Sequence, residues 1–134
     1  MKQLPYYEQK DRENVKKLRV MIQDLPPFCV EFFRGIEPQT SSRTRIAYAY
    51  DLKVFFDFLQ KENPVMEKLD KNSITLSHLD QIQVTDLEEY MEYLKYRFND
   101  RNQEVVNKER GIMRKISSLK SFYNYYYRRE MIKN

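Results

Sequence analysis

The sequence predicts an all-α domain, and three observations favour that class. The 134-residue chain contains only two glycines, whereas good helix formers such as Lys, Glu, Leu and Met are abundant. Its apolar residues recur at intervals of three and four positions, as on one face of a helix. No segment of useful length alternates between apolar and polar residues, as a half-buried strand does. The length fits one compact domain rather than two.

Two segments are expected before residue 40. Apolar residues at helical spacing predict a helix within residues 1–24, which we treat as an N-terminal extension of a domain formed by residues 25–134. A second segment begins at Leu25-Pro26-Pro27 and ends near Gly35, because proline is tolerated in the first turn of a helix.

The next helix is expected to begin after Pro38 and to end at Asn63-Pro64. Ser and Thr residues at 40–42 are candidate N-caps. One apolar stripe runs along this helix through Tyr48, Leu52, Phe55, Phe56 and Leu59.

Two more helices complete a predicted set of four main helices. One carries Leu87, Tyr90, Met91 and Leu94, and Thr85 with Glu88 is its expected capping box. The longest spans residues 107–131 and places Ile112, Ile116, Leu119, Tyr123 and Tyr126 on one face. Residues 76–82 are expected to form a single turn, and residues 70–73 and 99–103 are expected to be loops.

The composition excludes several functional classes. No apolar run approaches the roughly 18 residues of a membrane-spanning helix, and the first ten residues lack the apolar core of a signal peptide. Cys29 is the single cysteine, so an intrachain disulfide is impossible and a cytoplasmic location is expected. His78 is the single histidine, and the two glycines form no phosphate-binding loop. We therefore expect no metal site and no cofactor, and the composition disfavours an enzyme.

The positive charge is concentrated at one end of the chain. Residues 107–134 contain eight Lys or Arg and two Glu, a net charge of +6, whereas residues 76–100 have a net charge of −4. A localised basic surface attracts polyanions even when the total charge is only +4.

Two basic patches are candidates for anion binding. On the long helix, Arg110, Arg114, Ser117, Ser121 and Arg128 lie opposite Ile112 and Ile116, bordered by Ser118 and flanked by Lys108, Lys115 and Lys120. Arg and Lys with small hydroxyl residues suit phosphates and base edges. Arg43, Thr44 and Arg45 form the second patch, where backbone N–H groups at the start of a helix could meet a phosphate. The alternative for both patches is a solvated surface, with caps at the second.

Three segments together resemble one known family. Residues 42–59, 84–94 and 114–132 are similar to successive helices of the core-binding domain of tyrosine recombinases, the phage-type integrases. The first segment carries the family's Thr, Tyr, Asp-Leu and Phe at Thr44, Tyr48, Asp51-Leu52 and Phe55. The resemblance covers roughly residues 25–134.

The resemblance implies a four-helix SAM-like bundle with an N-terminal helical extension, which binds duplex DNA at a recombination site. Its partners would be that DNA, a separate C-terminal catalytic domain and other recombinase protomers. The DNA contacts it implies are Arg43, Thr44, Arg45, Lys108, Arg110, Arg114, Lys115, Ser118 and Lys120.

The resemblance does not extend to catalysis. The family's catalytic domain has an Arg three residues after a His, whereas Gln81 follows His78 at that spacing, and the chain stops where the linker would begin. We therefore expect an N-terminal portion of a longer recombinase, with no catalytic residues of its own. Tyr123 and Tyr126 are expected in the core rather than as nucleophiles. The alternative function is a helical protein–protein interaction module that uses the acidic face.

Overall fold

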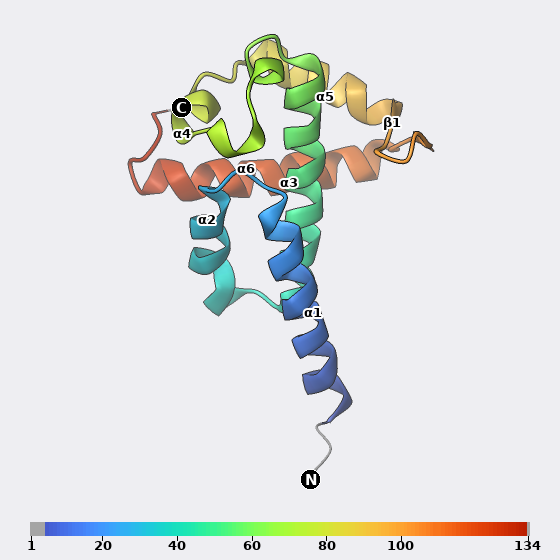
Figure 1. Cartoon of the computed structure of the whole chain (residues 1–134), viewed down its shortest axis with the longest axis vertical. Helices are drawn as coiled ribbons and strands as arrows, with labels where there is room; N and C mark the ends of the chain where they lie inside the picture. The colour runs from blue at the N-terminus through green and yellow to red at the C-terminus, as the bar shows by residue number, and fades with distance from the viewer. Residues whose placement is uncertain (1–4, 134) are drawn as a thin grey trace.

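The computed structural model describes residues 5–133, which form six α-helices and one short hairpin (Figure 1). The α-helices are α1 (Tyr6–Gln23), α2 (Cys29–Ile36), α3 (Ser42–Glu62), α4 (Leu76–Asp80), α5 (Val84–Lys95) and α6 (Glu109–Arg128). Three 3-10 turns join them: η1 (Glu37–Gln39), η2 (Met66–Lys68) and η3 (Lys71–Ser73). The predicted all-α class is confirmed.

Helix α3 is the centre of the bundle because it is buried along most of its length. Leu52, Phe55, Phe56 and Leu59 are each at most 3% exposed. Helices α1, α2, α5 and α6 surround α3, and α6 crosses it at a steep angle (Figure 1). Ser41 caps α3 by accepting a hydrogen bond from the backbone N–H of Thr44 at 3.1 Å, as the sequence predicted.

Aromatic rings fill the core between α2, α3 and α6. Phe32, Phe56 and Tyr126 each pack edge-on against Phe122, at centroid distances of 5.1–6.1 Å. Such edge-to-face pairs add to the free energy gained by burying the rings. This cluster fixes α6 across α2 and α3, and so positions the charged side chains of α6.

The N-terminal helix α1 packs along the first half of α3. Leu18 is buried against the core, and Met21 and Ile22 pack beside it. Ser42 at the start of α3 donates a hydrogen bond to Asp11 of α1 at 2.6 Å. The helix expected within residues 1–24 is therefore present and packed; residues 1–4 lie outside the described part.

One local prediction was wrong. The capping box of α5 is formed by Gln83 and Asp86, not by Thr85 and Glu88, because α5 begins two residues earlier than expected. Residues 99–103 are a turn as predicted, but they join strands β1 (Arg97–Phe98) and β2 (Glu104–Val105), which pair antiparallel. Strands of two residues are too short to produce an alternating pattern.

Between residues 5 and 133, no helix is long and apolar enough to cross a membrane.

Candidate nucleic-acid interface

Asp51 of α3 joins α3 to α6 where the two helices cross. Its side chain is 1% exposed and accepts three hydrogen bonds from α6. Arg114 Nη2 and Lys115 Nζ donate to Oδ1 at 3.1 and 2.9 Å, and Ser118 Oγ donates to Oδ2 at 2.7 Å. A buried carboxylate is tolerated when paired and hydrogen-bonded in this way. This Asp51 cluster fixes the position of α6 on α3.

The cluster changes the role of two predicted contact residues. Lys115 and Ser118 are 2% and 7% exposed, and their polar atoms point to Asp51 rather than to solvent. In this structure both side chains are therefore bonded within the bundle, and their predicted contact with DNA stays a prediction. The buried face of α6 is turned from the Ile112–Ile116 stripe toward Lys115, Ser118 and Phe122, because Asp51 gives the polar residues a buried partner.

Arg114 differs from its neighbour because its side chain remains 59% exposed. It contacts Asp51 through one nitrogen, so its other N–H groups remain available at the surface. It lines a hollow between α3 and α6 together with Thr44, Ala47, Tyr48, Asp51, Ser117, Ser118 and Ser121. Two predicted contacts from different helices, Thr44 and Arg114, therefore lie in one hollow.

This hollow continues along α6 toward the C-terminal end of the helix. A second hollow shares Tyr48 and Ser121 with it and is also lined by Gln39, Thr40, Asn124, Arg128 and Arg129. We call the two together the α3–α6 groove. The rise of α6 from Arg114 to Arg128 is about 21 Å, comparable to about six phosphates of one DNA strand. The only carboxylate among the lining residues is that of Asp51, which is already paired.

At the start of α3 the structure separates the three predicted contacts. Arg43 and Thr44 are exposed, but Arg45 is 7% exposed and donates to the backbone oxygens of Glu37 and Thr40 at 3.2 and 2.6 Å. Arg45 therefore holds η1 against α3, and its predicted contact with DNA stays a prediction. The sequence has no acidic residue at the start of this helix. In the structure, however, Asp11 of α1 accepts a hydrogen bond from Ser42 and so places a carboxylate there.

The remaining predicted contacts lie outside the groove lining. Lys108 is the N-cap residue of α6 and Arg110 is in its first turn, and both are exposed. Lys120 is exposed on another side of α6, where it lines an apolar hollow with Ile82, Val84, Leu87, Met91 and Tyr123. Lys120 therefore faces α5 rather than the α3–α6 groove.

Several groove residues were absent from the predicted contacts, among them Ser117, Ser121, Asn124, Arg128 and Arg129. The helical spacing already grouped Ser117, Ser121 and Arg128 with Arg114, so that signal was present. Arg129 is the C-cap residue of α6, and its guanidinium lies 4.0 Å from the centre of the Tyr125 ring. No periodic pattern marks such a position.

Tyr123 and Tyr126 of α6 are structural, whereas Tyr127 is 55% exposed. Tyr126 is fully buried and donates to the backbone oxygen of Phe28 at 2.6 Å; the half-buried Tyr123 donates to that of Leu79 at 3.0 Å. Burial raises the pKa of both hydroxyl groups above the ordinary value, which opposes formation of a phenolate nucleophile. The interpretation of both tyrosines as core residues is confirmed.

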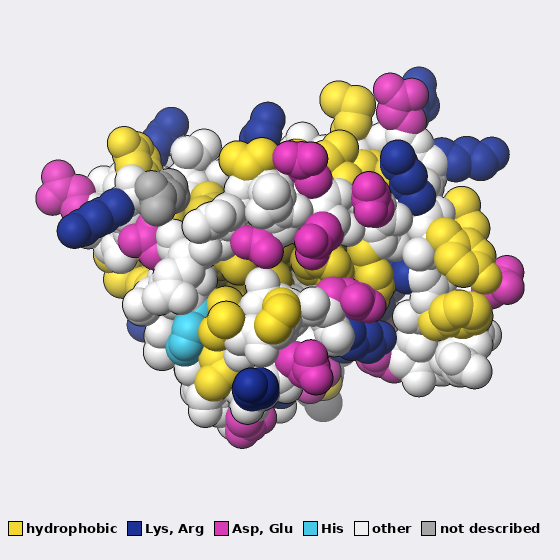
Figure 2. Space-filling view, turned by 90° about the horizontal axis from the view of Figure 1, so that it is seen from above, with side chains coloured by type: hydrophobic (Ala, Val, Ile, Leu, Met, Phe, Trp, Pro, Cys, Tyr) yellow, Lys and Arg dark blue, Asp and Glu magenta, His cyan; other side chains and the backbone are white. Residues whose placement is uncertain are grey.

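A different chemical character marks the face formed by α4 and α5. Figure 2 shows acidic side chains scattered among exposed apolar ones on this face. Helix α5 contributes Glu88, Glu89 and Glu92, all exposed, beside the apolar hollow of α5 and α6. Exposed carboxylates are thus frequent on this face, in contrast to the lining of the α3–α6 groove.

The comparisons with known proteins agree with this architecture. Residues 30–130 match the family model described as phage integrase, N-terminal SAM-like domain. The chain is 36% identical over 113 residues to a tyrosine recombinase XerC from Caldanaerobacter subterraneus subsp. tengcongensis. That alignment covers 80% of the chain and 31% of the relative, so the chain spans about a third of the relative's length. No solved structure matches the chain significantly. The chain belongs to the family of phage integrase N-terminal SAM-like domains.

Proposed function

We propose that this chain binds duplex DNA, with sequence selectivity, as the non-catalytic N-terminal module of a site-specific tyrosine recombinase. The observation that carries the proposal is the α3–α6 groove, in which Arg114 is held at the surface while the one nearby carboxylate is neutralised. Similarity to a protein named tyrosine recombinase XerC supports it.

The groove residues divide into two kinds of contact. Arg114, Arg128 and Arg129 carry the charge that attracts phosphates, and their positions along one helix match the length of a strand segment. Thr44, Ser117 and Ser121 are small hydroxyl residues that allow the backbone to approach closely and can bond to base edges. Arg43, Lys108 and Arg110, exposed at the two helix starts, extend the cationic surface.

The test is a titration of a fluorescent duplex at two salt concentrations. If several phosphates are neutralised, log K falls with log[salt] with a slope of about −0.9 for each phosphate. Arg114→Ala should weaken binding by about 1–2 kcal/mol and reduce the slope by about 1. Lys68→Ala is the matched control, because Lys68 is an exposed cation in η2 that lines neither hollow of the groove.

Binding that is tight but insensitive to salt would contradict the proposal. An Arg114→Ala variant with unchanged affinity would remove the groove from the interface. Substitution of Lys115 is not a suitable test, because Lys115 is buried on Asp51 and its loss would destabilise the fold.

The proposed partners are a C-terminal catalytic domain, which would perform strand cleavage, and other recombinase protomers bound to the same DNA. One observation favours a second role in protein–protein contact. The acidic α5 surface with its apolar hollow carries charge opposite to that of Lys10, Arg12, Lys16, Lys17 and Arg19, which are exposed on α1 beside Asp11 and Glu13. Sedimentation with and without duplex tests this role. DNA-dependent association supports protomer contact on DNA, and association without DNA supports a self-associating scaffold.

A further inference from the structure

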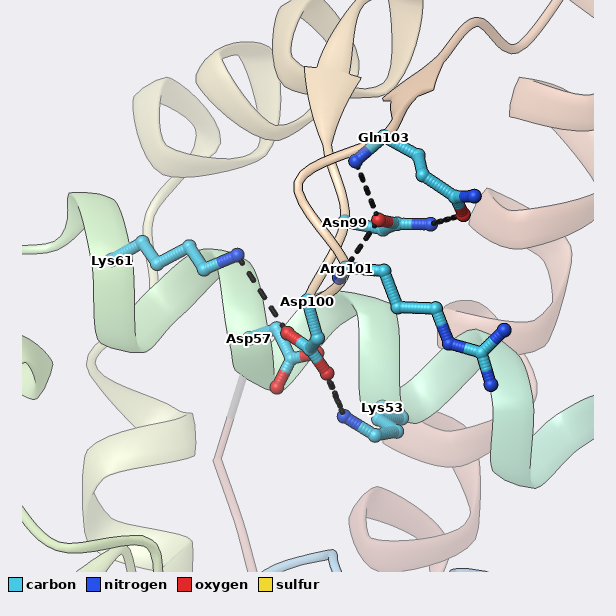
Figure 3. A network of polar contacts seen from close by, with 7 residues as sticks. All are labelled: Lys53, Asp57, Lys61, Asn99, Asp100, Arg101 and Gln103. Carbon is cyan, nitrogen blue, oxygen red and sulfur yellow. Dashed lines mark hydrogen bonds and ion pairs between the residues drawn. The ribbon is translucent and has the colours of Figure 1, made fainter.

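The turn between β1 and β2 is rigid, because one side chain closes it. The Asn99 side chain accepts hydrogen bonds from the backbone N–H groups of Arg101 and Gln103 at 3.0 and 2.9 Å, and it donates to the Gln103 side chain at 3.1 Å. Asn102 adopts a positive φ of 57°, which Asn tolerates better than most residues. Figure 3 shows the Asn99 bonds at the tip of the hairpin.

The hairpin is also fastened to the rest of the bundle. Asp100 contacts Lys53 and Lys61 of α3 at 3.1 and 3.9 Å (Figure 3). At the base of the hairpin, the buried Arg97 donates to Asn107, whose backbone N–H donates to Leu94 at the end of α5. The tip is therefore held against α3, and the base is held between α5 and α6.

Arg101 is the residue that this arrangement presents to solvent. It is exposed, and among the described residues its guanidinium has no hydrogen-bond or ion-pair partner. In Figure 3 it points away from Asp57 and Asp100. Both carboxylates instead contact Lys53. The rigid turn thus carries one uncompensated positive charge.

One contact connects the hairpin to the Asp51 cluster of the α3–α6 groove. Arg101 lines a hollow with Tyr50, Lys53 and Asp57 of α3 and with Asp100, and both carboxylates of that hollow are paired with Lys53. The Tyr50 ring lies 4.6 Å from the ammonium of Lys115, which belongs to the Asp51 cluster beside the groove. Tyr50 is 46% exposed, and its contact with Lys115 connects the hollow of Arg101 to the Asp51 cluster.

We propose that the hairpin is a second DNA-contacting element, in which Arg101 binds a backbone phosphate of a duplex lying in the α3–α6 groove. The proposal rests on the proposed DNA-binding function. Because the backbone of the turn is already ordered, binding has to order only the Arg101 side chain, which favours affinity. Asp100 acts as a positioning residue, since its contacts with Lys53 and Lys61 hold the turn against α3.

The experiment compares three variants of the whole chain, Arg101→Ala, Arg114→Ala and Lys68→Ala, by anisotropy of a fluorescent duplex of about 26 base pairs at two salt concentrations. Arg101→Ala should raise Kd about three- to tenfold and reduce the salt slope by about 0.9, the value for one phosphate. Lys68→Ala should change neither. Arg101 is exposed and unpaired, so its replacement leaves the fold intact.

Asp100→Asn separates this proposal from a simple charge effect. Removing a negative charge near DNA should tighten binding if only the total charge matters. If Asp100 positions Arg101, the same substitution should weaken binding about two- to fivefold, and amide exchange in residues 99–103 should accelerate.

Two outcomes distinguish failure of this inference from failure of the proposed function. If Arg114→Ala weakens binding but Arg101→Ala has the Kd and slope of the unmodified chain, the hairpin is not a contact and the groove remains one. If the unmodified chain does not bind the duplex, the DNA-binding function itself fails and the hairpin proposal fails with it.

Discussion

Asp51 and Asp100 each contact two cationic side chains, but the first carboxylate is buried and the second is exposed. Asp51 pairs with Arg114 and Lys115 and has an exposed fraction of 1%; Asp100 pairs with Lys53 and Lys61 and has an exposed fraction of 63%. Both join a neighbouring element to α3. They therefore offer the same type of contact in two different dielectric environments.

The comparison shows that one carboxylate of this domain contributes to its stability, whereas the other orients a single turn at the surface. A buried pair contributes through the large cost of leaving either partner alone, whereas an exposed pair is screened by water and contributes little to global stability. Asp51 is accordingly a determinant of the fold that also leaves Arg114 at the surface. Asp100 orients one turn and has little influence beyond it.

Asp51→Asn should have the largest effect on stability. It leaves the ammonium of Lys115, which is 1% exposed, without a negative partner. Breaking a buried pair in this way costs about 3–5 kcal/mol of unfolding free energy. Urea denaturation followed by circular dichroism measures the loss.

Lys115→Met in the Asp51→Asn background tests the cause. Removing the unpaired ammonium should recover most of the lost stability, because Met fills a similar volume without a charge. Asp100→Asn is the exposed counterpart and should cost less than about 1 kcal/mol. Equal losses for Asp51→Asn and Asp100→Asn would contradict the distinction between the two carboxylates.

The fold could be predicted from the sequence wherever burial follows a helical period. The apolar stripe of α3 and its end at Asn63-Pro64 gave a helix with nearly the observed bounds, Ser42–Glu62. The hairpin was missed, because β1 and β2 have two residues each and the hairpin is held mainly by side chains such as Asn99 and Arg97. Contacts between side chains of distant residues leave no period in the sequence.

The candidate site was predicted only in part, for a related reason. A helical wheel places Lys115 and Ser118 beside Arg114 but does not show that Asp51, on another helix, draws both into the interior. Similarly, Arg45 stands beside Arg43 in sequence, yet it turns toward the backbone oxygens of Glu37 and Thr40. Residue type and spacing indicated the cationic surface, whereas tertiary contacts decided which cations remain on it.

Tyr90→Phe adds a third case to the comparison of Asp51 with Asp100, namely a buried polar group without a hydrogen-bond partner among the described residues. Tyr90 is fully buried, and its hydroxyl is without a hydrogen-bond partner among the described residues. Its ring packs against Phe55 and Phe58 at 5.1 Å, contacts that Phe would keep. Removing the hydroxyl should therefore raise the unfolding free energy by about 1 kcal/mol. A loss of stability, measured by urea denaturation, would mean that the hydroxyl is satisfied in solution.

The smallest effect is expected from protonation of Asp100. The hydrogen bond from Lys53 and the charge of Lys53 hold the pKa of Asp100 below its ordinary value; burial opposes this shift, and the charge of Lys61 adds a smaller lowering effect. A lowered pKa in the folded state means that the contact is fully present above the ordinary carboxyl pKa and is lost as pH falls through the lowered one. The amide signals of Arg101 and Asn102, followed by NMR during acidification, should therefore shift with a midpoint below the ordinary carboxyl pKa. In Asp100→Asn that transition should be absent, and in the unmodified chain added salt should move the midpoint toward the ordinary value. A midpoint at or above the ordinary carboxyl pKa would show that Lys53 and Lys61 do not hold the turn in solution. Asp100 would then lack the ion pairs that Asp51 has, and the two carboxylates would differ in their contacts as well as in their burial.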